Sequence, residues 1–142
     1  ILSTSMTSLT EIHYVMKFLK GVDVILLHCN SGYPTPPEDA NISALVAMKA
    51  FGCPLGLSDH TFGMAAPILA VGYGARVIEK HLTLHRGLEG PDHHISLEPH
   101  EFEEMVLALR DAEKMVGDGI KRPTGSERGT QKIIKDRREW AA

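Results

Sequence analysis

The chain has 142 residues, of which 43% are hydrophobic and 23% are charged, and its formal net charge is −3. This is the composition of an ordinary globular domain, or of part of one, with enough apolar material for one core. No run of about 18 apolar residues occurs, which excludes a transmembrane helix, so we expect a cytoplasmic protein with no membrane partner.

Strand-like and helix-like segments alternate from the start of the chain. Four short apolar runs predict β-strands, and they lie at residues 1–4, 23–29, 54–58 and 76–81. Between the first two runs, Ser8 and Glu11 have the spacing of a capping box, which predicts the start of a helix over 8–20. The alternation favours a parallel sheet.

Two weaker helices are predicted around the third strand. Asn41 is a suitable N-cap for a helix over 42–51. A helix over 63–73 requires Pro67 to lie in its first turn. The preceding segment, 30–40, contains three prolines, so it is predicted to be a long, stiff loop of the kind that carries substrate contacts.

The last predicted helix is the most regular. It begins at Pro99, after a polar loop over 82–97. Acidic residues lie near its start, where their negative charge interacts favourably with the helix dipole. Its apolar residues recur at helical spacing, namely Phe102, Met105, Val106, Leu109 and Ala112.

Four βα units are half of a TIM (β/α)8 barrel, which takes about 250 residues. The chain also opens on Ile1 rather than methionine. We therefore expect residues 1–120 to be the C-terminal half of a barrel, with about four more units before Ile1. Such a half would have open sheet edges, so we expect it to aggregate or self-associate on its own.

Basic residues gather at the end of the chain. Residues 121–142 hold 7 basic and 3 acidic side chains, whereas residues 1–120 hold 8 basic and 15 acidic ones. A basic tail can bind nucleic acid. This one is short and nearly lacks aromatic residues, so we predict a solvated basic linker and no nucleic-acid partner.

A histidine lies at the end of the third predicted strand and another at the end of the fourth. They are His60 and His81. In a parallel barrel the carboxyl ends of neighbouring strands meet at one mouth, and imidazole is a good ligand for divalent transition metals. Two imidazoles leave coordination positions open for water and substrate, as Lewis-acid catalysis requires. The alternative is that both are core histidines satisfied by backbone carbonyls.

Several further polar residues are candidates for the same mouth. Glu79 shares a strand face with His81, and Ser58 shares one with His60. Asp59 and Glu79 either orient the imidazoles or are solvated strand-end charges. Asp92 follows a Gly-Pro turn that either holds it over the mouth or is a plain surface turn. Hydroxyls that suit a phosphate lie at three successive strand ends, namely Ser3, Ser31 and Ser58.

Six motifs occur in the order and spacing found in the sialic acid synthase family, and this resemblance covers essentially the whole chain. They are Ile1-Leu2-Ser3-Thr4, Leu27-His28-Cys29, Tyr33-Pro34-Thr35-Pro36 with Glu38-Asp39, Gly56-Leu57-Ser58-Asp59-His60-Thr61, Glu79-Lys80-His81 and Gly90-Pro91-Asp92-His93. The resemblance implies an enzyme that condenses phosphoenolpyruvate with an N-acyl hexosamine, such as N-acetylmannosamine. The product is a nine-carbon 2-keto sugar acid, and phosphate is released.

The resemblance also implies a cofactor and partners. His60 and His81 resemble the ligands of a divalent metal, Mn2+ or else Mg2+ or Co2+, which would polarise the aldehyde of the sugar. The family's enzymes are homodimers with a C-terminal antifreeze-like domain, toward which the linker 121–142 would lead. Lysines for phosphoenolpyruvate would come from the missing first half, so the fragment alone is expected to be inactive.

The resemblance assigns further residues to the substrates. Glu79 is implied as an acid/base or polarising group, and Tyr33 and Asp92 as contacts to the amino sugar. The predicted phosphoenolpyruvate contacts are the three serines Ser3, Ser31 and Ser58, and Asp59 is added to the substrate-binding set.

The sequence departs from the family pattern at two positions, and two other functions are alternatives to a synthase. Ser5 replaces a usual glycine, which predicts a strained or reshaped turn, and His85 stands where aspartate is common. The rival functions are another metal-dependent barrel enzyme, such as a sugar isomerase or aldolase, and a non-catalytic carbohydrate-binding relative.

Overall fold

A computed structural model describes residues 1–139 of the chain, and the last three residues of the predicted linker, 140–142, lie outside the described part. Four parallel strands form one sheet in the order in which they occur in the chain. They are β1 (Leu2–Ser3), β2 (Leu26–Cys29), β3 (Leu55–Asp59) and β4 (Val77–Lys80). The predicted α/β fold with a parallel sheet is therefore confirmed, with strands shorter than predicted at most of their ends.

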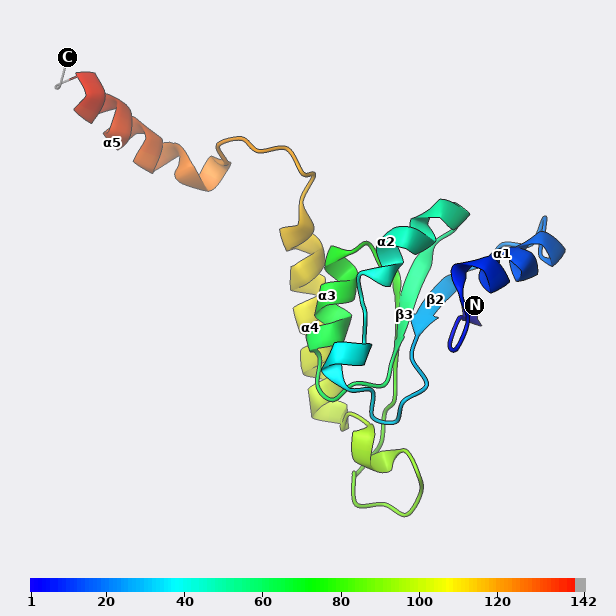
Figure 1. The fold of residues 1–142 in the computed structure, drawn as a ribbon. Helices are drawn as coiled ribbons and strands as arrows, with labels where there is room; N and C mark the ends of the chain where they lie inside the picture. Colours follow the sequence, from blue (N-terminus) through cyan, green and yellow to red (C-terminus); the bar gives the residue numbers. More distant parts are fainter. Residues whose placement is uncertain (140–142) are drawn as a thin grey trace.

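Helices follow each strand (Figure 1), and they are α1 (Leu9–Phe18), α2 (Ala44–Met48), α3 (Ala65–Gly72) and α4 (Pro99–Val116). The capping box at the start of α1 forms as predicted, because Ser8 accepts from the Glu11 amide and Glu11 accepts from the Ser8 amide. Pro67 lies in the first turn of α3, and Pro99 opens α4. These starts tolerate proline because the first-turn amides have no helical partner.

Asn41 does not have the predicted capping role. Its side chain instead accepts a hydrogen bond from the Ser43 hydroxyl at 3.1 Å, and its backbone has a positive φ of 40°. The helix begins three residues later, at Ala44, and tightens into a 3-10 turn over Lys49–Phe51. Asparagine tolerates this left-handed conformation better than most residues, so a turn takes the place of the predicted cap.

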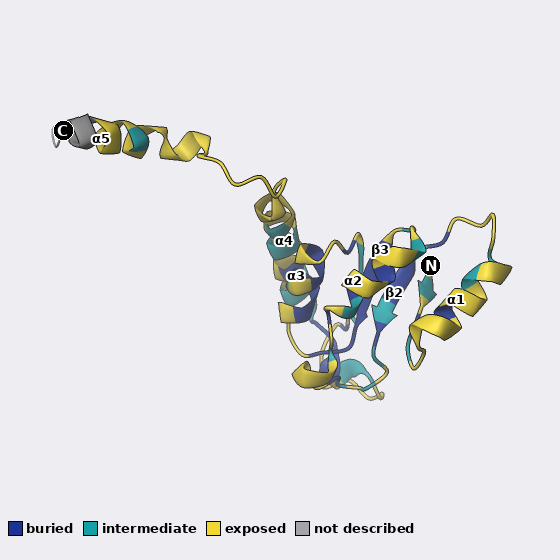
Figure 2. Cartoon of the chain, turned by 45° about the horizontal axis from the view of Figure 1, so that its top comes forward, coloured by how far each residue is buried: buried dark blue, intermediate teal, exposed yellow. Residues whose placement is uncertain are grey.

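The tail is also more regular than the predicted linker. A 3-10 turn at Gly125–Glu127 is followed by a helix, α5 (Arg128–Glu139), which extends away from the sheet in Figure 1. The side chains described between residues 121 and 135 are nearly all exposed (Figure 2). Whether this segment links to a further domain stays a prediction.

The two faces of the sheet differ. One face packs against the helices and carries the core, which includes Leu26, Leu55 and Leu57. Side chains alternate along a strand, so Leu27, Gly56 and Val77 fall on the opposite face, where they lie side by side in the ladder. A Cβ on Gly56 would meet Leu27 Cδ2 at 2.5 Å and the Val77 carbonyl at 2.4 Å, so only glycine fits there. We call the face with Gly56 the inner face and the other the outer face.

None of the helices in the described part of the chain combines the length and the apolar character needed to cross a membrane.

Candidate functional site

The two strand-end histidines lie beside each other. Ser58 pairs with Glu79 and Asp59 with Lys80 in the β3–β4 ladder, and the next residue on each strand is a histidine. The imidazole centroids of His60 and His81 are 5.3 Å apart, with the rings inclined at 65°. Parallel pairing in register therefore brings two distant positions of the chain to one edge of the sheet.

The contacts of His60 determine which ring nitrogen is free. Its Nδ1 lies 2.6 Å from the Asn30 carbonyl oxygen, and because a carbonyl only accepts, Nδ1 must carry the proton. The neutral ring then presents the lone pair of Nε2. A carbonyl behind the ring, as here, is how metal-binding histidines are usually oriented.

Tyr33 completes a small aromatic group around the histidines. Its ring stacks on His60 with centroids 4.1 Å apart and meets His81 edge-on at 5.7 Å. Burial raises the pKa of its phenol, with smaller contributions from the charges of Cys29, Asp92 and Glu79. Tyr33 therefore stays protonated at neutral pH and can donate a hydrogen bond to a ligand.

Asp92 reaches the same edge from the loop after β4. Its Oδ2 is 4.0 Å from His81 Nδ1, and both side chains are partly exposed. The loop is held by bonds within itself: the Ser96 hydroxyl donates to the Asp92 carbonyl at 2.6 Å, and the Thr83 hydroxyl lies 2.8 Å from His93 Nδ1. Whether this turn brings Asp92 to a substrate or is a plain surface turn stays a prediction.

Glu79 lies on the inner face with a defined partner. The Ser58 hydroxyl donates to Glu79 Oε1 at 2.6 Å. A hollow of about 240 Å³ at this end of the strands is lined by Ser58, His60, Glu79, Lys80 and His81. Acidic, hydroxyl and imidazole groups thus meet at one cavity.

The predicted hydroxyls at the other strand ends lie in different surroundings. Ser31 forms a hydrogen bond with the Ser5 hydroxyl, while Ser3 is exposed at the end of β1. Ser5 itself has no positive φ; that conformation falls on the next residue, Met6, at 55°. The turn that contains Ser5 therefore has a positive φ at a residue other than glycine, in line with the predicted strained or reshaped turn. The Ser5–Ser31 contact is one that sequence reasoning missed.

Asp59 lies apart from the cavity, contrary to its predicted place among the substrate contacts. It faces away from Ser58 and His60, its side chain is 2% exposed, and Lys80 Nζ lies 2.7 Å from its Oδ2. Its Oδ1 accepts from the Thr61 amide at 2.9 Å, and its Oδ2 also accepts from the Thr61 hydroxyl at 3.2 Å. These contacts occupy the carboxylate, so it neither touches an imidazole nor faces the cavity. Strand alternation was the signal that separates it from Ser58.

The remaining histidines and cysteines of the motifs have structural or solvated roles. His28 Nε2 donates to the Ala40 carbonyl at 2.9 Å, as expected for a structural imidazole. His85 and His94 are exposed. Cys29 is buried beside Ser58, and burial raises the pKa of its thiol above the usual value.

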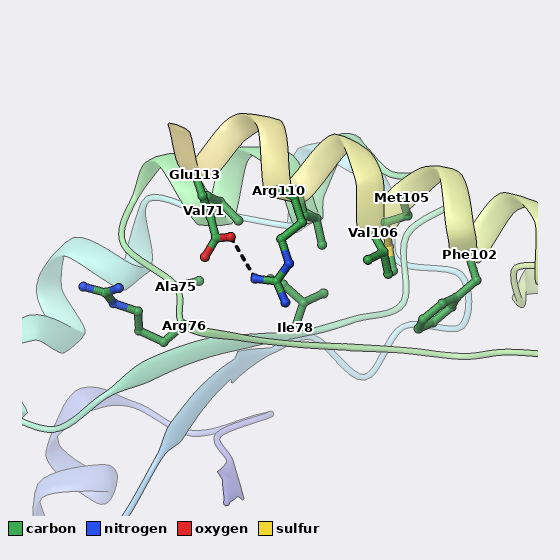
Figure 3. A pocket seen from close by; sticks show the side chains of 10 residues that line it. Val71, Ala75, Arg76, Ile78, Phe102, Met105, Val106, Arg110 and Glu113 are labelled. Atoms are coloured by element: carbon green, nitrogen blue, oxygen red, sulfur yellow. Dashed lines mark hydrogen bonds and ion pairs between the residues drawn. The ribbon is translucent and has the colours of Figure 1, made fainter. Parts of the chain in front are cut away.

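A second cavity, of about 200 Å³, lies between α4 and β4 (Figure 3). Its walls are mostly apolar, with Ile78, Phe102 and Met105 among them, and Arg110 there pairs with Glu113 at 2.8 Å. It is lined by no histidine and by no residue of the site above. Its lining suits packing rather than chemistry.

The donors present fit an open metal site rather than a closed one. Among the described residues, no group of three or more histidine, cysteine, aspartate or glutamate side chains is arranged to hold a metal. If a metal binds here, the two imidazoles would supply two ligands, and water, substrate or residues beyond this chain would supply the others. Catalytic metal sites keep such open positions.

The chain is similar to known proteins over most of its length. The NeuB family model matches residues 1–121. An uncharacterized protein of Methanocaldococcus jannaschii is 49% identical, with 100% of this chain and 43% of that protein covered. The N,N'-diacetyllegionaminic acid synthase of Legionella pneumophila is 39% identical, with 95% and 40% covered.

A solved structure also resembles this chain in both fold and sequence. The N-acetylneuraminic acid (sialic acid) synthetase of Leptospira borgpetersenii, crystallised with citrate, superposes with a TM-score of 0.82 at 39% identity, covering 96% of this chain and 48% of that one. The chain thus spans less than half the length of these relatives. The family match over most of the chain and the shared fold lead to one conclusion: the chain belongs to the NeuB family.

Proposed function

We propose that this chain forms the C-terminal four βα units of a (β/α)8 barrel. The complete protein would condense phosphoenolpyruvate with an N-acyl hexosamine, giving a nine-carbon 2-keto sugar acid and phosphate. The observation that carries the proposal is the pair of imidazoles, 5.3 Å apart at adjacent strand ends, with Glu79 on the same edge of a NeuB-family chain.

His60 and His81 would hold a divalent metal, Mn2+ or else Mg2+ or Co2+. When bound, the metal would act as a Lewis acid toward the sugar aldehyde. The contact with the Asn30 carbonyl occupies Nδ1 of His60, so Nε2 is the ring nitrogen that would bind the metal. Tyr33 covers one face of the His60 ring and so limits the access of water to it.

Glu79 is the proposed acid/base group. The Ser58 hydroxyl bond leaves its second oxygen, Oε2, available to take or deliver a proton. Asp92 and Tyr33 lie beside His81 and are the proposed contacts to the hydroxyls of an amino sugar. Ser3, Ser31 and Ser58 are proposed donors to phosphoenolpyruvate.

These residues alone would not balance the charge of phosphoenolpyruvate. Lys80 is the basic residue at the cavity, and its ammonium is already paired with Asp59. The cationic groups for the phosphate and carboxylate must therefore come from other parts of the full-length protein. We expect residues 1–142 alone to be inactive for this reason.

The test uses the full-length protein and measures phosphate release with both substrates, with each alone, and with a metal chelator. His60→Ala is expected to remove turnover and to lower the bound metal. His13→Ala, an exposed histidine on α1, is the matched control and should do neither. Turnover without phosphoenolpyruvate would point to an isomerase or aldolase instead. Normal metal content and turnover in His60→Ala would refute the proposal.

A further inference from the structure

The ion pair between Asp59 and Lys80 is unusual for its burial. Both side chains are at most 2% exposed, and their charged atoms are 2.7 Å apart. Taking two charges out of water costs several kcal/mol per ion, and the attraction between them often only offsets that cost. A pair of this kind is therefore weak evidence for stability, and a role in specifying one arrangement is the better-supported hypothesis.

The ion pair lies at the ends of β3 and β4, immediately before the two histidines. The β3–β4 ladder ends at Asp59 and Lys80, and beyond it the two chain segments take other partners. The His60 carbonyl accepts from the Thr35 amide and the His81 carbonyl from the Leu97 amide. Both of those donors lie in loops, so the backbone ladder does not hold the two histidines together.

The side chain of Lys80 connects the two strand ends by hydrogen bonds. Its ammonium donates to the Asp59 carboxylate and also to the Thr61 carbonyl. Asp59 in turn accepts from the Thr61 amide and hydroxyl. The residues on both sides of His60 are thus bonded to the residue that immediately precedes His81.

We infer that Asp59 and Lys80 are positioning residues, which hold the His60 and His81 imidazoles at the separation that a metal ion requires. The inference rests on the proposed function, because it assigns a role toward the same metal. The charged ends of Asp59 and Lys80 meet on the outer face, where they bond to each other and to Thr61. Residues that orient metal ligands typically change metal affinity by about 10- to 100-fold when they are altered.

The test is the double variant D59N/K80M in the full-length protein. It leaves no charge buried alone, and the side-chain amide introduced by D59N can still accept from the Thr61 amide, so the fold is expected to persist. Its Mn2+ affinity, measured by titration calorimetry or by electron paramagnetic resonance, is expected to fall about 10- to 100-fold. D111N/K114M makes the same chemical change in an exposed pair on α4 and should leave the affinity unchanged.

A second control separates positioning from general destabilisation. Leu45→Ala removes a fully buried core side chain far from the ion pair in sequence. It should lower the melting temperature, yet leave Mn2+ affinity as in wild type at a temperature where both are folded. If D59N/K80M does not fold, Lys80→Arg keeps a cation opposite Asp59 in altered geometry, and we expect a smaller loss of affinity.

A metal-free readout keeps this inference distinguishable from the proposed function. The Nδ1 proton of His60, donated to Asn30, should give a downfield proton resonance in histidine-labelled protein. The resonance should persist in D111N/K114M and be lost or broadened in D59N/K80M. A wild-type protein that takes up no Mn2+ would overturn the proposed function. Unchanged affinity together with an unchanged resonance in D59N/K80M would overturn the inference.

Discussion

Two consecutive rungs of the β3–β4 ladder place polar pairs in opposite surroundings. Ser58 and Glu79 meet on the inner face, beside the histidines and a cavity, whereas Asp59 and Lys80 meet on the outer face, out of contact with water. Both pairs combine a strand-end carboxylate with a hydrogen-bond donor. Strand alternation decides that one pair faces the cavity and the other is packed within the protein.

A carboxylate in a family motif is therefore not always a substrate contact. Altering a polar group beside the cavity should change chemistry more than stability, and truncating an apolar core side chain on the outer face should do the reverse. Three variants on the sheet test this contrast, a fourth tests an ion pair away from it, and they follow in order of expected effect.

Glu79→Gln should have the largest effect and should act on turnover. General acid–base groups contribute about 10²- to 10⁴-fold to rate, so kcat for phosphate release in the full-length protein should fall by that order. Because the amide can still accept from Ser58, the melting temperature should hardly move. Ser43→Ala, a change at an exposed hydroxyl, is the control. Wild-type kcat in Glu79→Gln would exclude the acid/base role.

Leu57→Ala should act on stability instead. Leu57 is 3% exposed on the outer face and belongs to the core. Truncating a buried leucine typically costs about 2–5 kcal/mol of unfolding free energy. Chemical denaturation measures this loss, and kcat of the remaining folded protein should stay near wild type. A kcat that falls as far as that of Glu79→Gln would show that the two faces are not separable.

Gly56→Ala tests whether close packing on the inner face contributes to stability. The added Cβ would collide with the Val77 carbonyl and with Leu27 Cδ2, and over-packing of this kind typically costs about 1–3 kcal/mol. We expect a lower denaturation midpoint, whereas Gly72→Ala, on open space in α3, should not lower it. Wild-type stability in Gly56→Ala would mean that β3 and β4 can move apart at no cost.

Glu101→Gln should have the smallest effect and should depend on pH. A hydrogen bond from Arg86 and one from the Glu98 amide lower the pKa of Glu101 from 4.5. A lowered folded-state pKa stabilises the protein above the unfolded-state value, and this stabilisation is lost as pH falls through the folded-state value. The variant should therefore be less stable at pH 7, by less than about 1 kcal/mol, and equal to wild type in acid. A pH-independent difference would contradict this assignment.

Local patterns predicted the elements well where a local physical rule applies. The Ser8–Glu11 capping box, Pro67 and Pro99 in first turns, and the alternation of strands and helices are all confirmed. Asn41 fails because a turn competes with the cap, and the helix in the tail was missed because composition does not distinguish an irregular linker from an exposed helix. The metal, the substrates and the site roles remain predictions.

Spacing and alternation in the sequence were enough to establish the order of the elements, the parallel sheet, and the place of His60, Glu79 and His81 at neighbouring strand ends. The hydrogen-bond partners came only from the folded chain: Asn30 for His60, Lys80 for Asp59, and Ser5 for Ser31. The two kinds of information differ in range. Periodicity acts over a few residues, whereas these contacts join residues 21 to 30 positions apart and form only when the strands align in register.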